Sequence, residues 1–367
     1  MYSPKLLRQV IYILICTVLV TVCRSPQQGS VVTPLSPTPI LTVPAISQLR
    51  DYWPTDGWRT SSPEEQEMNS ETLTKMEQVI EEQLPHLRSV LIVRHGYLVF
   101  ERYYQGYDQN SYHEIHSVAK SIVSALIGIA LQSGYLDSVD QKVIDFFPDY
   151  VTPDLDPQVK EITLEGLLTM TAGYRYCADA AGCFPKPGED PIKFALEQPL
   201  TTPPGQKFQY NNATVFPLLV ETLVRATKMD ALEFANTTLC EPLGMSASCE
   251  RLSKDGTFKP RDLAKFGYLY LNQGVWDGQQ IIPAEWVKTS TQRQNKGGNP
   301  HGAEYGYLFW VTTVEGYSAY FAGGYGGQFI YVVPDLDIVV VITSDFERHH
   351  EENRIIVDGF IIPAVME

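Results

Sequence analysis

The strongest constraint on the fold is the position of the β-rich runs, which lie near the two ends of this 367-residue chain. Residues 89–94 and 97–102 are β-rich runs separated by two turn residues, a pattern that predicts a hairpin. Near the other end, residues 327–333 and 338–344 have the apolar pattern of two further strands. We therefore expect an antiparallel sheet built from the N- and C-terminal segments.

The middle of the chain, about residues 117–294, has a helical pattern, and a final amphipathic helix is expected from about Glu351. Together with the terminal strands, this predicts an α+β fold, in which helices flank the sheet and an all-helical lobe is inserted. With 44% hydrophobic residues, the chain can bury a large core. The cleft between sheet and lobe is the expected place for a site.

The charge balance argues against some classes of partner. The formal net charge is -15, and Lys and Arg form no cluster along the sequence. Phosphate backbones and anionic membrane surfaces both attract positive charge. We therefore expect no nucleic acid and no anionic membrane surface as a partner.

The N-terminus has the pattern of a signal peptide. Lys5 and Arg8 precede an apolar run over residues 10–22, which is too short for a comfortable membrane span. Cys23 follows where a bacterial lipoprotein carries its lipidated cysteine, although Val22 stands where Gly, Ala or Ser is usual. We expect export to an extracytoplasmic location, and we leave a lipid anchor at Cys23 open.

The sequence then divides into two further parts. Residues 24–49, after the predicted signal peptide (residues 1–23), are rich in Pro, Ser, Thr and Gln and have no periodic pattern. Such a segment is typical of an extended linker. Residues 50–367 are left as the folded domain.

Four cysteines lie beyond the predicted signal peptide. An even number of cysteines in an exported chain indicates disulfides, and the short spacings favour the pairs Cys177–Cys183 and Cys240–Cys249. A metal site is the alternative, but no histidine spacing matches one.

Residues 117–131 are apolar on nearly every face after the first turn, which predicts a buried helix. Ser117 and Lys120 lie three residues apart and so share one face of that helix. Burial and the helix dipole both disfavour an ammonium ion, and a neutral lysine can accept the serine proton. The backbone N–H of Ser117 would face a developing oxyanion. The alternative is a helix-capping serine and a lysine that reaches the surface.

Several other segments occur in a fixed order around this pair. They are His116-Ser-Val-Ala-Lys120, Leu167-Leu-Thr-Met-Thr-Ala-Gly173, Pro203-Pro-Gly-Gln-Lys-Phe-Gln-Tyr-Asn-Asn212, Pro242-Leu-Gly-Met245 and Gly323-Gly-Tyr-Gly-Gly-Gln328. With these motifs, residues 52–362 resemble the serine hydrolases of the β-lactamase and penicillin-binding-protein type, especially the branch with class C β-lactamases, esterases and 6-aminohexanoate-dimer hydrolases. The resemblance implies a β-lactamase/transpeptidase-like fold and an acyl-enzyme on Ser117, with no metal or organic cofactor.

By that resemblance, residues 210–212 correspond to the Y-x-N element of the family. Tyr210 would share the proton of Ser117, and Asn212 would contact Lys120 or the substrate. A phenol beside an ammonium ion is driven toward phenolate, so Tyr210 could itself remove the proton. The choice of base between Lys120 and Tyr210 stays open, because a strongly coupled pair need not have a single answer.

The third family element normally begins with Lys or His, but this chain has Tyr325-Gly326-Gly327. The glycines would let a substrate lie against the strand, and the N–H of Gln328 would be the second oxyanion donor. Tyr325 supplies no cation for a substrate carboxylate, so we expect weak or absent β-lactamase activity. A glycine-rich turn without a binding role is the alternative.

Aromatic residues near the expected cleft could line an acyl pocket, although packing is the favoured interpretation for the group. Tyr174 is the first of them to consider for substrate contact, because it directly follows the motif at residues 167–173. The five residues are Tyr174, Tyr176, Tyr305, Tyr307 and Trp310.

The sequence thus predicts an exported serine hydrolase that cleaves a small-molecule or peptide-like ester or amide through Ser117. A D,D-peptidase or β-lactamase is one alternative. A non-catalytic protein of the same fold that binds peptidoglycan or peptides is another. A Ser-His-Asp hydrolase that uses His116 is a third, but no G-x-S-x-G motif surrounds Ser117.

Overall fold

The computed structural model describes residues 50–177, 183–345 and 355–365. The predicted signal peptide, the linker before residue 50 and Cys23 lie outside these ranges. The expected start of the last helix, at Glu351, lies outside them too.

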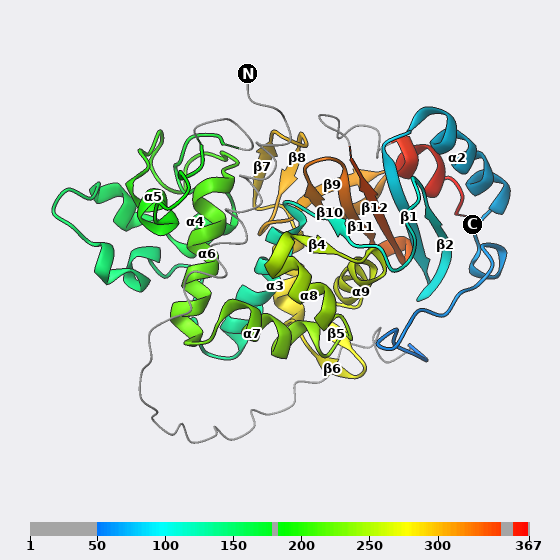
Figure 1. Cartoon of the computed structure of the whole chain (residues 1–367), viewed down its shortest axis with the longest axis horizontal. Coiled ribbons are helices and arrows are strands. Elements are labelled where there is room, and N and C mark those ends of the chain that lie inside the picture. Colours follow the sequence, from blue (N-terminus) through cyan, green and yellow to red (C-terminus); the bar gives the residue numbers. More distant parts are fainter. Residues whose placement is uncertain (1–49, 178–182, 346–354, 366–367) are drawn as a thin grey trace.

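One antiparallel sheet of eight strands forms the centre of the molecule (Figure 1), with the strand order β2-β1-β12-β11-β10-β9-β8-β7. The N-terminal hairpin pairs with the last strand, because Val90 of β1 lies opposite Ile342 of β12. A sheet built from both ends of the chain is therefore confirmed. Its strands are β1 (Leu87–Arg94), β2 (Tyr97–Tyr103), β7 (Asn295–Gly298), β8 (Ala303–Tyr305), β9 (Trp310–Val314), β10 (Tyr317–Gly324), β11 (Gln328–Val333) and β12 (Ile338–Ser344).

The sheet is wider than the sequence pattern predicts, because strands β7 to β10 were not expected. β7 consists of Asn, Lys and two glycines, so it has no apolar alternation. It is held at the sheet edge by its pairing with β8. The middle of the chain also contains two short strand pairs between its helices, β3 (His113–Glu114) with β4 (Thr257–Phe258) and β5 (Val275–Trp276) with β6 (Gln279–Gln280).

Helices cover both faces of the sheet (Figure 1). α2 (Ser70–Gln83) packs with the C-terminal helical segment Val357–Ile361 on one face, and α3 (Val118–Gln132) and α9 (Pro260–Leu271) lie on the other. A separate helical lobe extends beyond β7 and β8, and contains α4 (Leu164–Leu168), α5 (Pro191–Glu197) and α6 (Asn212–Thr227). The remaining helices are α7 (Ala231–Ala235), α8 (Ser246–Asp255) and α10 (Ala284–Thr291). The α+β class is confirmed.

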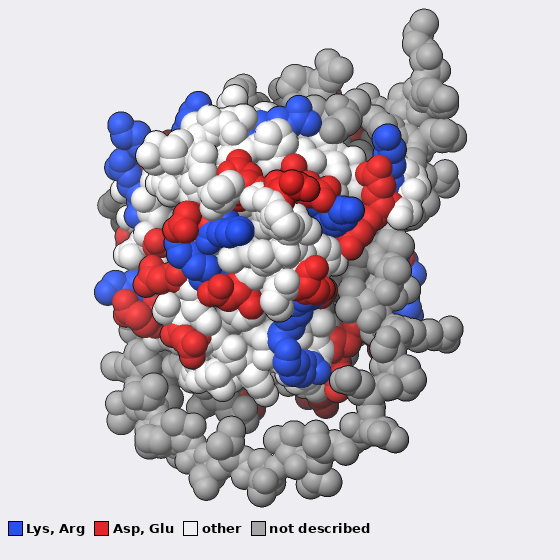
Figure 2. All heavy atoms as spheres, turned by 90° about the vertical axis from the view of Figure 1, so that its left-hand side faces the viewer, with Lys and Arg blue, Asp and Glu red and all other residues white. Residues whose placement is uncertain are grey.

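Acidic and basic side chains are interspersed on the face that the helical lobe presents (Figure 2). No helix within the described ranges has both the length and the apolar character needed to cross a bilayer.

Both predicted disulfides are confirmed. Their Cα atoms are 5.9 Å apart in Cys177–Cys183 and 6.4 Å apart in Cys240–Cys249. Disulfides persist in oxidising compartments, so the pair is typical of a protein outside the cytosol.

Candidate active site

Ser117 lies at the start of α3, where its side chain makes no capping hydrogen bond. Its Oγ instead accepts a hydrogen bond from Lys120 Nζ, at 2.9 Å. The preceding residue, His116, has a φ of 47°. Residues other than glycine rarely adopt this left-handed conformation, which is often found at functional sites. The simple capping role that remained open for Ser117 is therefore wrong.

The side chain of Lys120 is buried, with only 6% of its surface exposed. Its Nζ lies 5.4 Å from the ring centre of Tyr210 and 5.7 Å from that of Phe216. Burial lowers the pKa of Lys120 to about 7. A large fraction of this lysine is therefore the neutral amine at neutral pH, which is the form that can accept a proton.

Tyr210 lies immediately before α6, and the side chain of the next residue, Asn211, caps that helix by accepting from the N–H of Thr214 at 3.0 Å. Tyr210 is fully buried, and burial raises its pKa, although a hydrogen bond with Ser117 opposes the rise. The expected shift toward phenolate is therefore wrong. The physical reason is desolvation, which outweighs the neighbouring groups and favours the neutral phenol.

Aromatic rings hold the side chain of Tyr210 in place. Trp310 stacks on it, with ring centres 5.7 Å apart and an interplanar angle of 26°, and the edge of Tyr305 meets it at 6.3 Å. Both neighbours are buried. Tyr307 is buried as well and donates a hydrogen bond to Glu165 at 2.8 Å. These three residues pack, as the favoured interpretation predicted.

Tyr174 was the first tyrosine considered for substrate contact, but Tyr176 is the more exposed of the two. Tyr174 is only 2% exposed, so its surface is not available to a substrate in this structure. Tyr176 is 46% exposed and interacts electrostatically with Tyr210. The sequence does not indicate which of the two tyrosines is exposed, because the segment that carries them forms no regular helix or strand.

The segment where β10 ends and turns into β11 also reaches Ser117. A Cβ atom at Gly324 would collide with the carbonyl oxygen of Ile115 and would stand 3.3 Å from the backbone nitrogen of Ser117. Only glycine therefore allows this approach. β9 pairs with β10 only as far as Phe321, so the last residues of β10 extend beyond the end of β9. The sequence has several glycines in this segment, and its pattern does not indicate that Gly324 is the one that approaches Ser117.

The other residues predicted from the third element lie in or beside this turn. Gly326 and Gly327 have φ values of 80° and 91°, which this tight turn requires. Gln328 begins β11 opposite Gly324, and its side chain is engaged with the backbone of Ser344 and Tyr325. Tyr325 is 40% exposed.

A contact between His116 and Glu114, next to Ser117, was not predicted. His116 Nε2 lies 3.6 Å from a carboxylate oxygen of Glu114, and the imidazole meets the ring of Tyr325 edge-on at 5.6 Å. His116 is the first residue of the motif at residues 116–120, but that motif does not indicate a contact with Glu114. Only the turn at residue 116 brings the imidazole beside both partners.

Asn212 is the first residue of α6, and its backbone N–H donates to the carbonyl of Cys177 at 2.9 Å. No group of three or more His, Cys, Asp and Glu residues in the described part of the chain could hold a metal ion. A surface groove of about 620 Å³ lies at the other end of β9 and β10, lined among others by Arg293, Glu304 and Ser318, and none of the site residues lines it.

A comparison with models of protein families identifies the family of this chain. The model described as Beta-lactamase matches residues 80–248 and 254–356. The chain belongs to the beta-lactamase family. It is therefore an enzyme of the beta-lactamase-related serine hydrolase type.

Solved structures of beta-lactamase-like proteins share the fold at low sequence identity. A protein assigned as a 6-aminohexanoate-dimer hydrolase, from Bacillus anthracis, is 20% identical with a TM-score of 0.65, over 78% of this chain and 80% of that chain. An octameric penicillin-binding protein homologue from Pyrococcus abyssi is 18% identical with a TM-score of 0.65, over 81% and 78%. A family VIII carboxylesterase is 14% identical with a TM-score of 0.64, over 83% and 98%. No curated protein matches the chain.

Proposed function

We propose that this member of the beta-lactamase family hydrolyses an ester or amide through an acyl-enzyme on Ser117. The observation that carries the proposal is the hydrogen bond of 2.9 Å between Ser117 Oγ and the buried amine of Lys120. Burial keeps that amine partly neutral at neutral pH, so a base lies next to the nucleophile.

In the proposed mechanism, Lys120 takes the proton of Ser117 as Oγ attacks the substrate carbonyl. Tyr210 is a neutral phenol that donates its proton to the leaving group and receives one from the lysine. Its raised pKa supports this role over that of a phenolate base. A water molecule then attacks the acyl-enzyme, loses a proton to the same groups and regenerates Ser117.

Two backbone N–H groups are proposed as oxyanion donors. The first belongs to Ser117, at the start of α3. The second is proposed to come from the segment between Gly324 and Gln328, because the end of β10 at Gly324 lies against the Ser117 nitrogen. The N–H of Gln328 stays the predicted donor. The side chain of Asn212, which was predicted to contact Lys120 or the substrate, stays a prediction.

The substrate is proposed to lack a carboxylate at the turn between β10 and β11. Tyr325 there is exposed and uncharged, and Glu114 beside His116 adds negative charge next to the nucleophile. Like charges repel, so an anionic substrate group is disfavoured at this position. Tyr176 and Tyr325 are two exposed aromatic surfaces that an apolar acyl or leaving group could contact.

Export is part of the proposal. It is supported by the apolar run after Lys5 and Arg8 and by two disulfides. Lipid attachment at Cys23 and the extended linker over residues 24–49 stay predictions, and the domain that follows is proposed to act outside the cytoplasm.

Labelling with a fluorophosphonate probe tests the nucleophile. We expect the wild type to be labelled and the Ser117→Ala variant to be unlabelled. Ser133→Ala is the matched control, because Ser133 is exposed at the other end of α3. A panel of p-nitrophenyl esters, D-amino-acid amides and nitrocefin then tests the substrate class, with esters expected to be the best substrates. Absence of labelling and turnover in the wild type would support the non-catalytic binding protein instead.

A further inference from the structure

We propose that the Cys177–Cys183 disulfide is a positioning element for Tyr210, so that turnover depends on this bond being intact. The inference rests on the proposed function, because it acts through Tyr210. It extends that function by making the hydrolase sensitive to the redox state of one cysteine pair.

The backbone of Cys177 is bonded on both sides to the segment that carries Tyr210. Its N–H donates to the carbonyl oxygen of Tyr210 at 2.8 Å, and its carbonyl accepts from the N–H of Asn212 at 2.9 Å. The side chain of Asn211 adds a third bond, since its Nδ2 donates to the carbonyl of Arg175 at 2.8 Å. The short segment that ends at Cys177 therefore fixes the backbone of Tyr210.

Different contacts hold the two ends of this segment. Before Cys177, the carbonyl of Gly173 accepts from the N–H of Thr201 at 2.8 Å, and Tyr174 is buried in the main core. Cys177 and Cys183 form a small hydrophobic cluster with Ala213 in the first turn of α6, and Phe184 and Phe194 pack against it. This cluster is separate from the main core. The disulfide is therefore part of the small cluster that packs Cys177 against the first turn of α6. We expect breaking the disulfide to loosen Cys177, and with it one side of the Tyr210 backbone.

The consequence for catalysis follows from the distances that Tyr210 must keep. Its hydroxyl has to stay within hydrogen-bonding reach of Ser117 and of the leaving group, and proton transfer fails when such a group moves by about 1 Å. Trp310 restrains the ring but not the carbonyl of Tyr210. We therefore expect loss of the disulfide to lower kcat, with less effect on KM.

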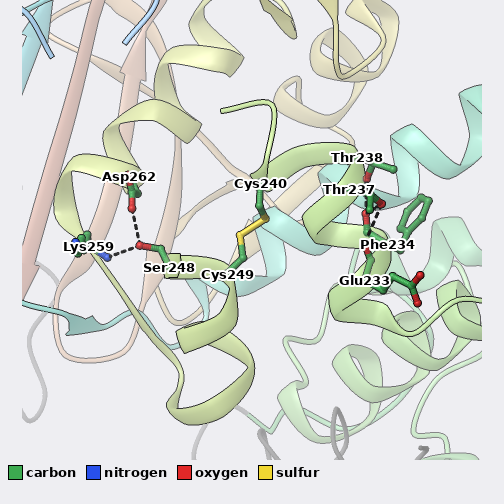
Figure 3. The surroundings of a disulfide bond; sticks show 9 residues. All are labelled: Glu233, Phe234, Thr237, Thr238, Cys240, Ser248, Cys249, Lys259 and Asp262. Carbon is green, nitrogen blue, oxygen red and sulfur yellow. Dashed lines mark hydrogen bonds between the residues drawn. A yellow bond between two sulfur atoms is a disulfide. The ribbon is translucent and has the colours of Figure 1, made fainter. Parts of the chain in front are cut away.

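The second disulfide provides a matched control. Cys240–Cys249 joins the segment after α7 to α8, and Ser248 beside it bonds to Asp262 and to the backbone of Lys259 (Figure 3). The sequence separations of the two disulfides are 6 and 9 residues, so chain entropy predicts similar effects on stability. The backbone bonds found for Cys240 and Cys249 run to Met245 and not to the active site.

The first experiment compares C177S/C183S with C240S/C249S, using a p-nitrophenyl ester that the wild type hydrolyses. We expect kcat to fall about tenfold or more in C177S/C183S and to stay within about twofold of wild type in C240S/C249S. Both variants are expected to have a lower melting temperature than the wild type. Equal activity of the two variants, or a loss confined to melting temperature, would overturn the proposal.

A double-mutant cycle shows whether the effect passes through Tyr210. In the Tyr210→Phe background, C177S/C183S is expected to change kcat by less than about twofold further, because the group it positions is already gone. The same fold-loss in both backgrounds would refute positioning. If Ser117→Ala and Tyr210→Phe both keep full activity, the proposed function fails. If they lose activity and C177S/C183S does not, only this inference fails.

Reduction of the folded protein covers the case in which C177S/C183S does not fold. In the C240S/C249S variant, a dithiol such as dithiothreitol reduces Cys177–Cys183 to two thiols and is itself oxidised to a disulfide. Alkylation with mass spectrometry verifies which cysteines are reduced. We expect activity to fall with reduction and to return on reoxidation. Full activity with Cys177 completely alkylated would contradict the proposal.

Discussion

Lys120 and Lys265 are both buried helical lysines, with 6% and 5% of their surfaces exposed, but their surroundings differ. The ammonium of Lys265 in α9 donates to the carbonyls of Thr55 and Gly244 at 3.0 Å, and lies 3.4 Å from the carboxylate of Asp262. The amine of Lys120 in α3 meets the hydroxyl of Ser117 and the faces of two aromatic rings. The surroundings of Lys265 stabilise the ammonium ion, whereas those of Lys120 favour the neutral amine.

The difference shows how a fold can lower the pKa of a buried lysine, as the proposed base requires. Burial lowers the pKa of both residues, but Asp262 opposes the shift at Lys265. For Lys120, desolvation is the sole cause of the shift to about 7. The contact follows from the spacing of three residues between Ser117 and Lys120. The neutral amine is favoured because no carboxylate among the described residues offsets the desolvation. Lys265 instead joins the N-terminal arm at Thr55 to the loop that Cys240–Cys249 closes.

Replacing Lys120 is expected to give the largest effect. We predict that Lys120→Met lowers kcat/KM by about 10³-fold, because a positioned general base contributes about 10² to 10⁴. The unfolding free energy is expected to stay the same or rise, since methionine removes a buried amine that has no carboxylate partner in the part of the chain that the structure describes. Steady-state kinetics and urea unfolding measure the two quantities. A destabilised but active variant would remove the distinction between the two lysines.

Replacing Lys265 is expected to have the opposite effect, a loss of stability with little loss of activity. Lys265→Met should lower the unfolding free energy by about 3 kcal/mol, because it leaves the Asp262 carboxylate buried without its cation. Turnover by the folded protein should stay within about twofold of wild type. Urea unfolding and the rate with a p-nitrophenyl ester give the comparison. A large loss of activity without loss of stability would mean that this lysine also serves the reaction.

The pH dependence of activity separates the two sites further. Because burial lowers the pKa of Lys120 to about 7, the neutral amine is lost as pH falls below 7. We expect kcat/KM to rise through about pH 7 and then to level off, and to be about tenfold lower at pH 6 than on the plateau. Initial rates in buffers of constant ionic strength provide the test. A flat profile from pH 5 to 9 would argue against a neutral lysine base.

Tyr210→Phe is expected to give the smallest effect, on the midpoint of the pH profile, and it tests which residue titrates there. The pKa of Tyr210 is raised, so the phenol stays neutral across the range in which Lys120 titrates. We expect the midpoint of the pH profile to move by less than about half a unit, although the plateau falls. Movement of the midpoint by more than one unit would show that the tyrosine shares the titration.

Some of these features could be predicted from residue spacing. The contact between Ser117 and Lys120 follows from helix geometry, because residues three apart share one face. The terminal hairpins and both short-range disulfides depend on segments that are close in the sequence, and all were predicted. β7 was missed because its polar residues carry no strand pattern, and pairing with β8 alone makes it a strand.

Other parts of the site could not be predicted, because they depend on contacts between distant segments. Gly324 reaches Ser117 only through the packing of α3 on the sheet, and no pattern distinguishes it from its glycine neighbours. The raised pKa of Tyr210 is a result of its burial among aromatic rings from the sheet. The exposure of Tyr176 and the burial of Tyr174 likewise follow from how the irregular segment before Cys177 lies against the start of α6.

The sequence by itself determined the contact between Ser117 and Lys120, the α+β class and the disulfide pairs, because each depends on short-range geometry or on a repeating apolar pattern. Only the tertiary structure decided which amine loses its charge, which phenol keeps its proton and which glycine approaches the serine. Those properties depend on desolvation and close packing, which exist only when segments far apart in the chain come together.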